Sequence, residues 1–185
     1  MTGATGAAIG VEILRVLREQ PGIETHLVLS RWARATIELE TDLTVRAVSD
    51  LADVTYAWNE QDAAISSGSF PADAMIIAPC SMKTLAGIRT GYAEGLVCRA
   101  ADVTLKEGRR LVLMPRETPL SEIHLENMLA LARMGVRIVP PMPAFYNLPK
   151  SIEDLVTHLA VRALDQLDLQ LPSEQRWTGM PRAAR

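Results

Sequence analysis

Short apolar runs that alternate with amphipathic segments constrain the fold of this chain most strongly. Four runs have the composition of strands buried on both faces of a parallel sheet, at residues 24–29, 74–78, 111–114 and 136–139. Segments with helical periodicity separate them, at residues 9–19, 31–40, 45–51, 96–106, 121–135 and 151–167. This order predicts an α/β fold, a three-layer doubly wound and mostly parallel sheet in a single domain.

Length and composition agree with one globular domain. The chain has 185 residues, of which 48% are apolar, so it is long and apolar enough to form a proper core. We place the domain at residues 1–170 and a C-terminal arm at 171–185, in which Trp177 is the large apolar anchor. A formal net charge of −3 gives no reason to expect a nucleic-acid partner. No apolar run is long enough for a membrane span.

Several classes of site are disfavoured by the motifs that the sequence lacks. There is no GxxxxGK[ST] motif, no GxSxG motif and no cluster with metal-ligand spacing, so we expect no P-loop, no hydrolase site and no metal. Cys80 and Cys98 also lack metal-site spacing, and we expect them to remain thiols in a cytoplasmic protein.

The chain begins with a Gly-rich turn, residues 2–7, directly before the first helical segment. A turn that enters a helix N-terminus offers backbone N–H groups and a positive dipole end, which suit a phosphate. The small residues of this turn are equally compatible with close packing alone. We expect a strand ahead of such a turn, and only Met1 precedes it in this sequence.

Polar side chains follow the predicted strands at the point where each strand ends. Because ligands of open α/β sheets bind outside the carboxyl ends of the strands, these residues predict one pocket. Backbone donors, hydroxyls and cations outnumber carboxylates there, which favours a phosphorylated ligand, with two phosphates rather than one. Charged surface loops, with Lys83 in solvent, are the alternative. The residues concerned are Ser30, Ser81, Met82, Lys83, Thr84, Arg116, Glu117 and the loop that carries Tyr146, while Glu40 lies at a helix-to-loop junction.

A second group of cations lies within residues 96–106. Arg99 and Lys106 are seven residues apart, which puts them on one face of the predicted helix. They are either a solvated stripe paired to Asp102 and Glu107 or one wall of an anion pocket. The hydroxyl-rich segment 66–69 is likewise either a flexible loop or a cover over an anion.

Seven segments, taken in order, resemble the UbiX flavin prenyltransferase family over nearly the whole chain: GATGA, ETD at residues 40–42, SSGSF, APCSMKT, RAADVTLKE, PRETPLSEIHLENM and PAFYNLP. The sequence looks closest to the members that are called subunits of phenolic acid decarboxylases. The resemblance implies a Rossmann-like flavoprotein fold and a homododecamer that binds FMN between subunits. It implies transfer of a dimethylallyl group from dimethylallyl monophosphate to reduced FMN. The prenylated FMN would serve a UbiD-type aromatic acid decarboxylase, and no metal is required.

The same resemblance implies a role for each matching residue. FMN contacts fall on Gly3, Ala4, Thr5, Ser30, Ser81, Met82, Lys83 and Thr84, with Arg116 shared between flavin and substrate. The dimethylallyl phosphate is held by Arg99, Lys106, Tyr146 and Arg162. Catalytic roles fall on Glu40 near the reacting flavin nitrogen, on Glu117 near the leaving phosphate, and on Lys106.

Two other functions remain open from the sequence. A flavoprotein of the cysteine-decarboxylase type, which oxidises its substrate with FMN, needs a base at the flavin. The candidates His26, His124 and His158 lie in no motif of that kind. The other alternative is an accessory subunit that binds FMN for a phenolic or aromatic acid decarboxylase and has no turnover of its own.

Overall fold

A computed structural model describes residues 1–169 of the chain and shows a parallel sheet in two parts. In one part β1 (His26–Val28) pairs with β2 (Val54–Tyr56). In the other, β3 (Ala74–Cys80), β4 (Arg110–Pro115) and β5 (Arg137–Ile138) lie in that order. The parallel pairing confirms the predicted α/β class. The arm 171–185 lies outside the described residues, so the predicted division of the chain stays a prediction.

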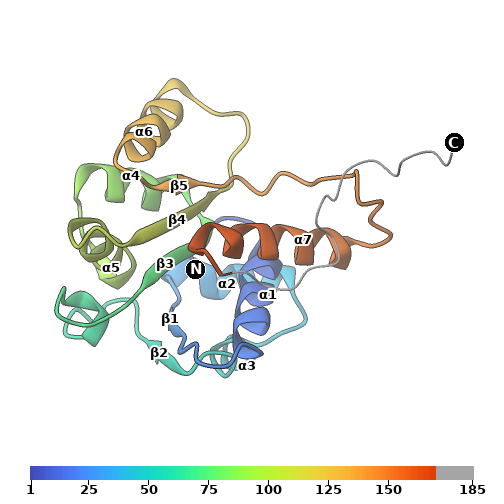
Figure 1. Cartoon of the computed structure of the whole chain (residues 1–185), viewed down its shortest axis with the longest axis horizontal. Helices are drawn as coiled ribbons and strands as arrows, with labels where there is room; N and C mark the ends of the chain where they lie inside the picture. The colour runs from blue at the N-terminus through green and yellow to red at the C-terminus, as the bar shows by residue number, and fades with distance from the viewer. Residues whose placement is uncertain (170–185) are drawn as a thin grey trace, which may run out of the picture.

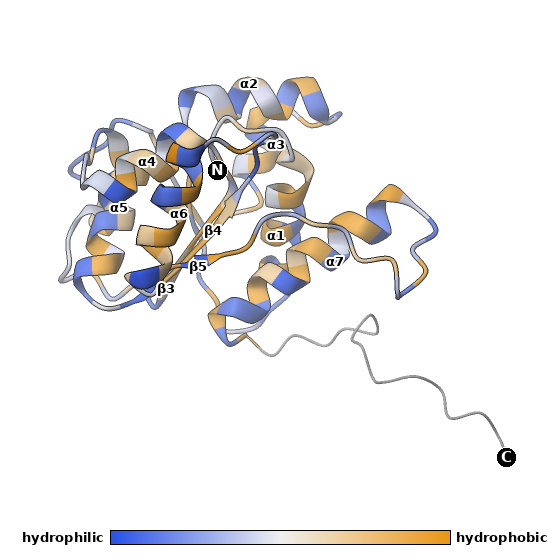
Figure 2. Ribbon diagram, turned by 90° about the horizontal axis from the view of Figure 1, so that it is seen from above, coloured by the Kyte–Doolittle hydropathy of each residue, from blue (hydrophilic) through white to orange (hydrophobic). Residues whose placement is uncertain are grey.

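Helices cover both faces of the sheet and complete three layers (Figure 1). One apolar core lies between β3–β4 and the helices α4 (Met82–Thr90), α5 (Gly95–Lys106) and α6 (Glu122–Arg133). A second lies between the same strands and the helices α1 (Ala7–Arg18) and α7 (Ile152–Leu164). Figure 2 shows the apolar colour of β4 at the centre, between these two helical layers. Helices α2 (Arg31–Glu40) and α3 (Val45–Ser49) enclose a third core with α1 and β1.

The connections add two short 3-10 turns, η1 (Ala64–Ser66) and η2 (Asp165–Leu167). The second turn follows α7 directly, so the predicted helix at 151–167 is this pair of elements. No helix within residues 1–169 has the length and apolar composition needed to cross a membrane.

Two elements escaped prediction, and each has a physical reason. Strand β2 has three residues, none of them fully buried, so its apolar signal is weak. Helix α4 begins at Met82, immediately after β3, where residues 81–84 were expected only as polar ligand contacts at a strand end. Ser81 in fact caps α4, because its hydroxyl accepts a hydrogen bond from the Thr84 N–H. Ser30 caps α2 in the same way.

Helix α1 approaches β3 so closely that only glycine fits at the point of contact. A Cβ atom at Gly10 would lie 2.4 Å from the carbonyl oxygen of Ala78 and 2.6 Å from the terminal methyl of Met1. The backbone oxygen belongs to a buried strand and cannot move aside cheaply. The spacing of the first helical layer therefore depends on this residue.

Gly10→Ala is expected to lower the free energy of unfolding by roughly 1–3 kcal/mol, because the added methyl overpacks the contact between α1 and β3. Gly87→Ala is the matched control: Gly87 is also inside a helix, but its Cβ would lie 3.4 Å from its nearest neighbours. That variant should gain stability by about 0.5–1 kcal/mol from helix propensity. Urea denaturation checks both, and equal effects of the two substitutions would contradict the close contact.

Candidate functional site

The first two residues tie the Gly-rich turn to the carboxyl ends of the strands. The Thr2 N–H and hydroxyl both donate to the Pro79 carbonyl, at 3.1 and 2.9 Å. The Ser81 N–H in turn donates to the Thr2 hydroxyl at 2.7 Å, and the Ser30 N–H donates to the Met1 carbonyl at 3.1 Å. The structure therefore brings the turn, Ser30 and Ser81 to one edge, as predicted. The role of Thr2 in linking the turn to the strand ends was not predicted. The only available signal was a threonine at the start of the turn.

Glu40 closes the start of α1 from the end of α2. Its Oε2 accepts hydrogen bonds from the N–H groups of Gly6 at 2.8 Å and Ala7 at 2.9 Å. A carboxylate is stabilised there by the positive end of the helix dipole. Two of the N–H groups that the turn was expected to offer a phosphate are consequently occupied. The N–H groups of residues 3–5 are not engaged by Glu40 and stay open to an anion at this turn.

The packing alternative describes Gly3 correctly. A Cβ atom at Gly3 would lie 2.2 Å from the Cβ of Trp32 on α2. Any side chain at position 3 would therefore displace α2, whatever is bound at the turn. A substitution of Gly3 cannot report on phosphate binding alone.

Arg116 extends the same edge beyond β4. Its N–H donates to the Cys80 carbonyl at 3.2 Å, which fixes the end of β4 beside the end of β3 and beside Ser81. Arg116 forms none of the ion pairs found within residues 1–169. The adjacent Glu117 is exposed and accepts a hydrogen bond from the Thr118 N–H at 3.0 Å. The edge thus offers an uncommitted guanidinium next to backbone and hydroxyl donors.

Lys83 and the two cysteines contribute differently. The Lys83 side chain is 88% exposed and lies 3.9 Å from Glu94, so the solvent-facing alternative holds for its ammonium group in this chain. Cys80 and Cys98 are free thiols. Burial raises the pKa of Cys80 to about 12, and burial also raises the pKa of Cys98. Both thiols therefore stay protonated at neutral pH.

Arg99 and Lys106, both on α5, form a second group of cations that lies against the loop at residues 66–70. Arg99 Nε donates to the Ser66 carbonyl at 3.0 Å, and its guanidinium pairs with Asp102 at 2.8 Å. Lys106 pairs with Glu107, and both side chains lie against Gly68. The hydrogen bond and charge of Lys106 lower the pKa of Glu107. Arg99 and Lys106 therefore form the predicted stripe of cations paired to Asp102 and Glu107. This stripe lies against the hydroxyl-rich loop at residues 66–69.

Arg109, which was not predicted, holds this same loop: its Nη2 donates to the Gly68 carbonyl at 2.7 Å. The group lies at the amino end of β4, whereas Arg116 follows the carboxyl end of that strand. Six residues of strand separate the two ends, roughly 20 Å. The predicted cations therefore fall into two separate places along the sheet.

Tyr146 and Arg162 lie on the other helical layer. The Tyr146 ring meets the buried ring of His158 on α7 edge-on, with centroids 6.0 Å apart. Arg162 pairs with Asp165 at 2.8 Å. Helix α7 covers the face of the sheet opposite to α5 (Figure 1). A single chain therefore does not bring these two residues to Arg99 and Lys106, and a site that uses all four must draw on more than one copy.

Replacing Glu40 tests its role as a cap. Glu40→Ala removes the acceptor of two N–H groups and should lower the free energy of unfolding by about 1–2 kcal/mol. Glu40→Gln keeps an acceptor oxygen and should lose less than half of that. Glu38→Ala, an exposed glutamate on the same helix, is the control and should change little. Chemical denaturation measures the free energy of unfolding of the three variants. An unchanged value for Glu40→Ala would contradict the role of Glu40 as a cap of α1.

Comparisons with known proteins agree over the whole chain. The family model described as Flavoprotein matches residues 1–162. A probable UbiX-like flavin prenyltransferase from a Streptomyces species is 70% identical over 185 residues, which is all of this chain and 92% of that protein. The structure of a dodecameric FMN-dependent UbiX-like decarboxylase from Escherichia coli has a TM-score of 0.94 at 62% identity, covering 97% of this chain and 100% of that one. AnUbiX in complex with FMN and dimethylallyl pyrophosphate has a TM-score of 0.93 at 54% identity, covering 98% and 96%.

Proposed function

The chain belongs to the UbiX-type flavin prenyltransferase family, and we propose that it transfers a dimethylallyl group from dimethylallyl monophosphate to reduced FMN. The main support is the near-complete structural match to a complex that holds both FMN and a dimethylallyl donor. The product, prenylated FMN, would pass to a UbiD-type aromatic acid decarboxylase. We further propose that the protein acts in the cytoplasm.

The carboxyl edge of the sheet has the donors that FMN needs. The N–H groups of residues 3–5, the hydroxyls of Ser30, Ser81 and Thr84 and the uncommitted guanidinium of Arg116 are suited to a phosphate and a polar ring edge. In this proposal Met82 and Lys83 complete the flavin contacts, and Arg116 is shared with the substrate.

The chemistry assigns tasks to the charged groups. Breaking an allylic C–O bond separates an allyl cation from a phosphate, so cations at the phosphate stabilise the charge that develops on it. Arg99, Lys106, Tyr146 and Arg162 would bind that phosphate, and Glu117 would give it a proton. Glu40 would accept a proton from the flavin, because both amides that it caps use Oε2 and leave Oε1 for this purpose.

The same placement favours a homo-oligomer, and we propose that it is a dodecamer. The four donors for the substrate phosphate lie on two faces of one chain, so a complete site needs neighbouring copies. Large apolar side chains are also exposed in the single chain, including Trp32 (73%), Leu39 (84%) and Phe145 (66%). Isolated apolar residues are common on surfaces, but a set of this size indicates burial against partners. The Escherichia coli relative is described as a dodecamer.

The two alternatives have less support. In the chain, Nδ1 of His26 is hydrogen bonded to Tyr56 and its Nε2 to Glu24, while His124 accepts a hydrogen bond from the N–H of Ser121 at the start of α6. His158 is buried beneath Tyr146. These engagements count against a histidine base of the cysteine-decarboxylase type. An accessory subunit would bind FMN through the same edge, so only turnover distinguishes it from an enzyme.

Anaerobic incubation of the protein with reduced FMN and dimethylallyl monophosphate should produce a flavin heavier by one dimethylallyl group. Mass spectrometry of the extracted flavin measures this, with dimethylallyl pyrophosphate as a parallel donor and heat-treated protein as the control. Unchanged flavin mass with both donors, while FMN is demonstrably bound, would favour the accessory subunit instead.

Substitutions should be able to weaken the binding of dimethylallyl monophosphate without weakening the binding of FMN. Arg162→Ala is expected to weaken dimethylallyl monophosphate binding roughly 10- to 150-fold, because it removes a charge-assisted contact, while FMN affinity changes less than about twofold. Arg46→Ala is the control and should affect neither ligand, because Arg46 is an exposed arginine on α3 that pairs with Asp50. Calorimetry with the substrate and fluorescence titration with FMN separate the outcomes. Equal loss of both ligands in Arg162→Ala would contradict the assignment.

A further inference from the structure

Two arginine side chains hold the hydroxyl-rich loop at residues 66–69. Arg99 on α5 donates from Nε to the Ser66 carbonyl at 3.0 Å. Arg109, between α5 and β4, donates from Nη2 to the Gly68 carbonyl at 2.7 Å. Arg99 already has a place at the substrate phosphate in the proposed function, whereas Arg109 has no assigned task. The Arg109 contact is the shorter of the two, and it falls in the middle of the loop.

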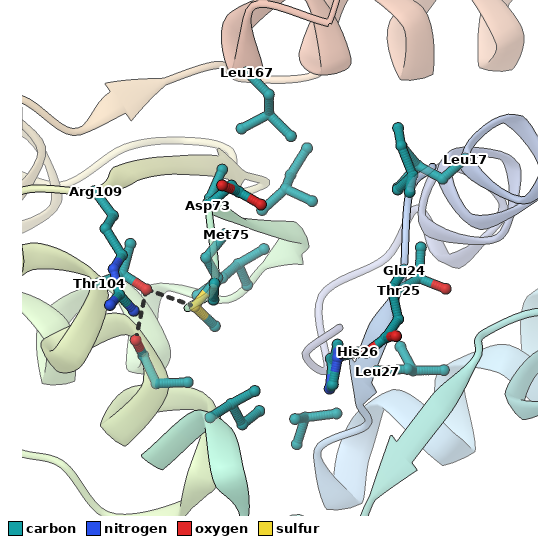
Figure 3. A pocket seen from close by; sticks show the side chains of 18 of the residues that line it. Leu17, Glu24, Thr25, His26, Leu27, Asp73, Met75, Thr104, Arg109 and Leu167 are labelled. Carbon is teal, nitrogen blue, oxygen red and sulfur yellow. Dashed lines mark hydrogen bonds and ion pairs between the residues drawn. The ribbon is translucent and has the colours of Figure 1, made fainter. Parts of the chain in front are cut away.

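The end of α5 fixes the place from which the Arg109 side chain starts. Gly108 takes a left-handed conformation with φ of +66°, which glycine adopts without strain. The Gly108 N–H donates to the Leu105 carbonyl at 3.0 Å. The Arg109 N–H donates to the Thr104 carbonyl at 2.9 Å, and Figure 3 shows these two residues next to each other. This pair of bonds is a Schellman motif, so the Arg109 backbone is anchored before its side chain reaches the loop.

The loop presents two hydroxyls beside the Lys106 ammonium group. Ser67 and Ser69 are exposed, and their Oγ atoms lie 2.9 Å apart across Gly68. A Cβ atom at Gly68 would lie 2.6 Å from Lys106 Nζ, so the ammonium group lies against the loop backbone at this residue. Gly68 is thus both the residue that Arg109 binds and the residue that Lys106 contacts. A shift of Gly68 would move both hydroxyls relative to Lys106.

The loop has few other constraints on its position. Its own hydrogen bonds are local: the Ser67 N–H donates to the Ala64 carbonyl at 3.1 Å, and the Phe70 N–H donates to the Ser67 carbonyl at 3.3 Å. Within residues 1–169, the hydrogen bonds that join residues 66–69 to distant parts of the chain are those of Arg99 and Arg109. Loss of the Arg109 guanidinium would therefore release the middle of the loop.

We propose that Arg109 is a positioning residue for prenyl transfer, because its hydrogen bond to Gly68 sets the loop at residues 66–69 against Lys106 and so shapes the site of the substrate phosphate. This inference rests on the proposed function, in which Lys106 binds that phosphate. The hydroxyls of Ser67 and Ser69 are donors that phosphate oxygens accept. Arginine suits the task, since its planar guanidinium holds its N–H donors in a fixed geometry. Arg109 acts through the loop and does not contact the substrate.

Arg109→Met removes the donor and keeps an unbranched side chain. The KM for dimethylallyl monophosphate should rise about tenfold or more, because the loop loses its place at the phosphate. Both kcat and the Kd for FMN should change less than about threefold. Amide exchange of residues 66–69 should become at least about tenfold faster. Arg109→Lys keeps a cation and a donor and should raise KM less than Arg109→Met does. An unchanged KM in Arg109→Met, or an equal loss of FMN and of the prenyl donor, would overturn the proposal.

Arg110→Met is the matched control. Arg110 is the next residue along the chain, but its guanidinium donates to the Leu167 carbonyl at 3.1 Å and pairs with Asp168, away from the loop. This variant should leave KM and the exchange of residues 66–69 unchanged. The same rise in KM in Arg109→Met and Arg110→Met would show a general effect of losing an arginine here and would overturn the role of Arg109.

Binding of inorganic phosphate tests Arg109 without turnover, so it separates this inference from the proposed function. Calorimetry on the FMN-saturated full chain compares the wild type, Arg109→Met, Lys106→Met and the double variant. Arg109→Met should weaken phosphate binding about tenfold when Lys106 is present and less than about twofold in the Lys106→Met background.

A wild-type protein that binds phosphate in this pattern and does not prenylate FMN would contradict the proposed function alone. Phosphate binding that is absent from the wild type would overturn the role of Arg109. Binding that Arg109→Met leaves unchanged, or weakens equally in both backgrounds, would overturn it too.

Discussion

The hydrogen bonds of Met1 and Thr2 connect β1 to β3, and so connect the two parts of the sheet. Within residues 1–169 the sheet is interrupted between β1 and β3, and these two residues bridge the interruption at the carboxyl edge. Thr2 is 2% exposed, and its hydroxyl both donates and accepts, so it costs little to bury. The positions of the Gly-rich turn, of Ser30 and of Ser81 all follow from this bridge.

The proposed function depends on the same edge. Glu40 draws the turn against the start of α1, and the Arg116 N–H bond to Cys80 sets β4 beside β3. The backbone that carries the donors proposed for FMN is therefore fixed by hydrogen bonds from the Gly-rich turn and from both strand ends. The donors proposed for the dimethylallyl phosphate are different, because α5 carries Arg99 and Lys106, whereas Arg162 on α7 and the Tyr146 ring that packs on α7 lie on the opposite face. Assembly of several copies, rather than folding of one, would complete that second site.

Much of this arrangement could be read from the sequence, for identifiable reasons. Residues 111–114 are buried, and residues 74–78 are partly to fully buried, so both apolar runs are unambiguous. The polar residues after them were correctly assigned to one edge. Strand β2 could not be predicted, because its side chains are only partly buried and its pairing with β1 is long-range. The Glu40 cap joins residues more than thirty positions apart, and the contact between Gly3 and Trp32 depends on how α2 packs. Neither leaves a local signal. The family resemblance supplied residue roles that no spacing could provide.

The central claim is that FMN binds at the carboxyl edge, and amide hydrogen exchange with and without FMN measures this most directly. Bound FMN should slow exchange at residues 3–5, at 81–84 and at Arg116, since these amides lie at the proposed phosphate and ring contacts. Protection confined to residues 66–70, or none at all under saturating FMN, would contradict the account.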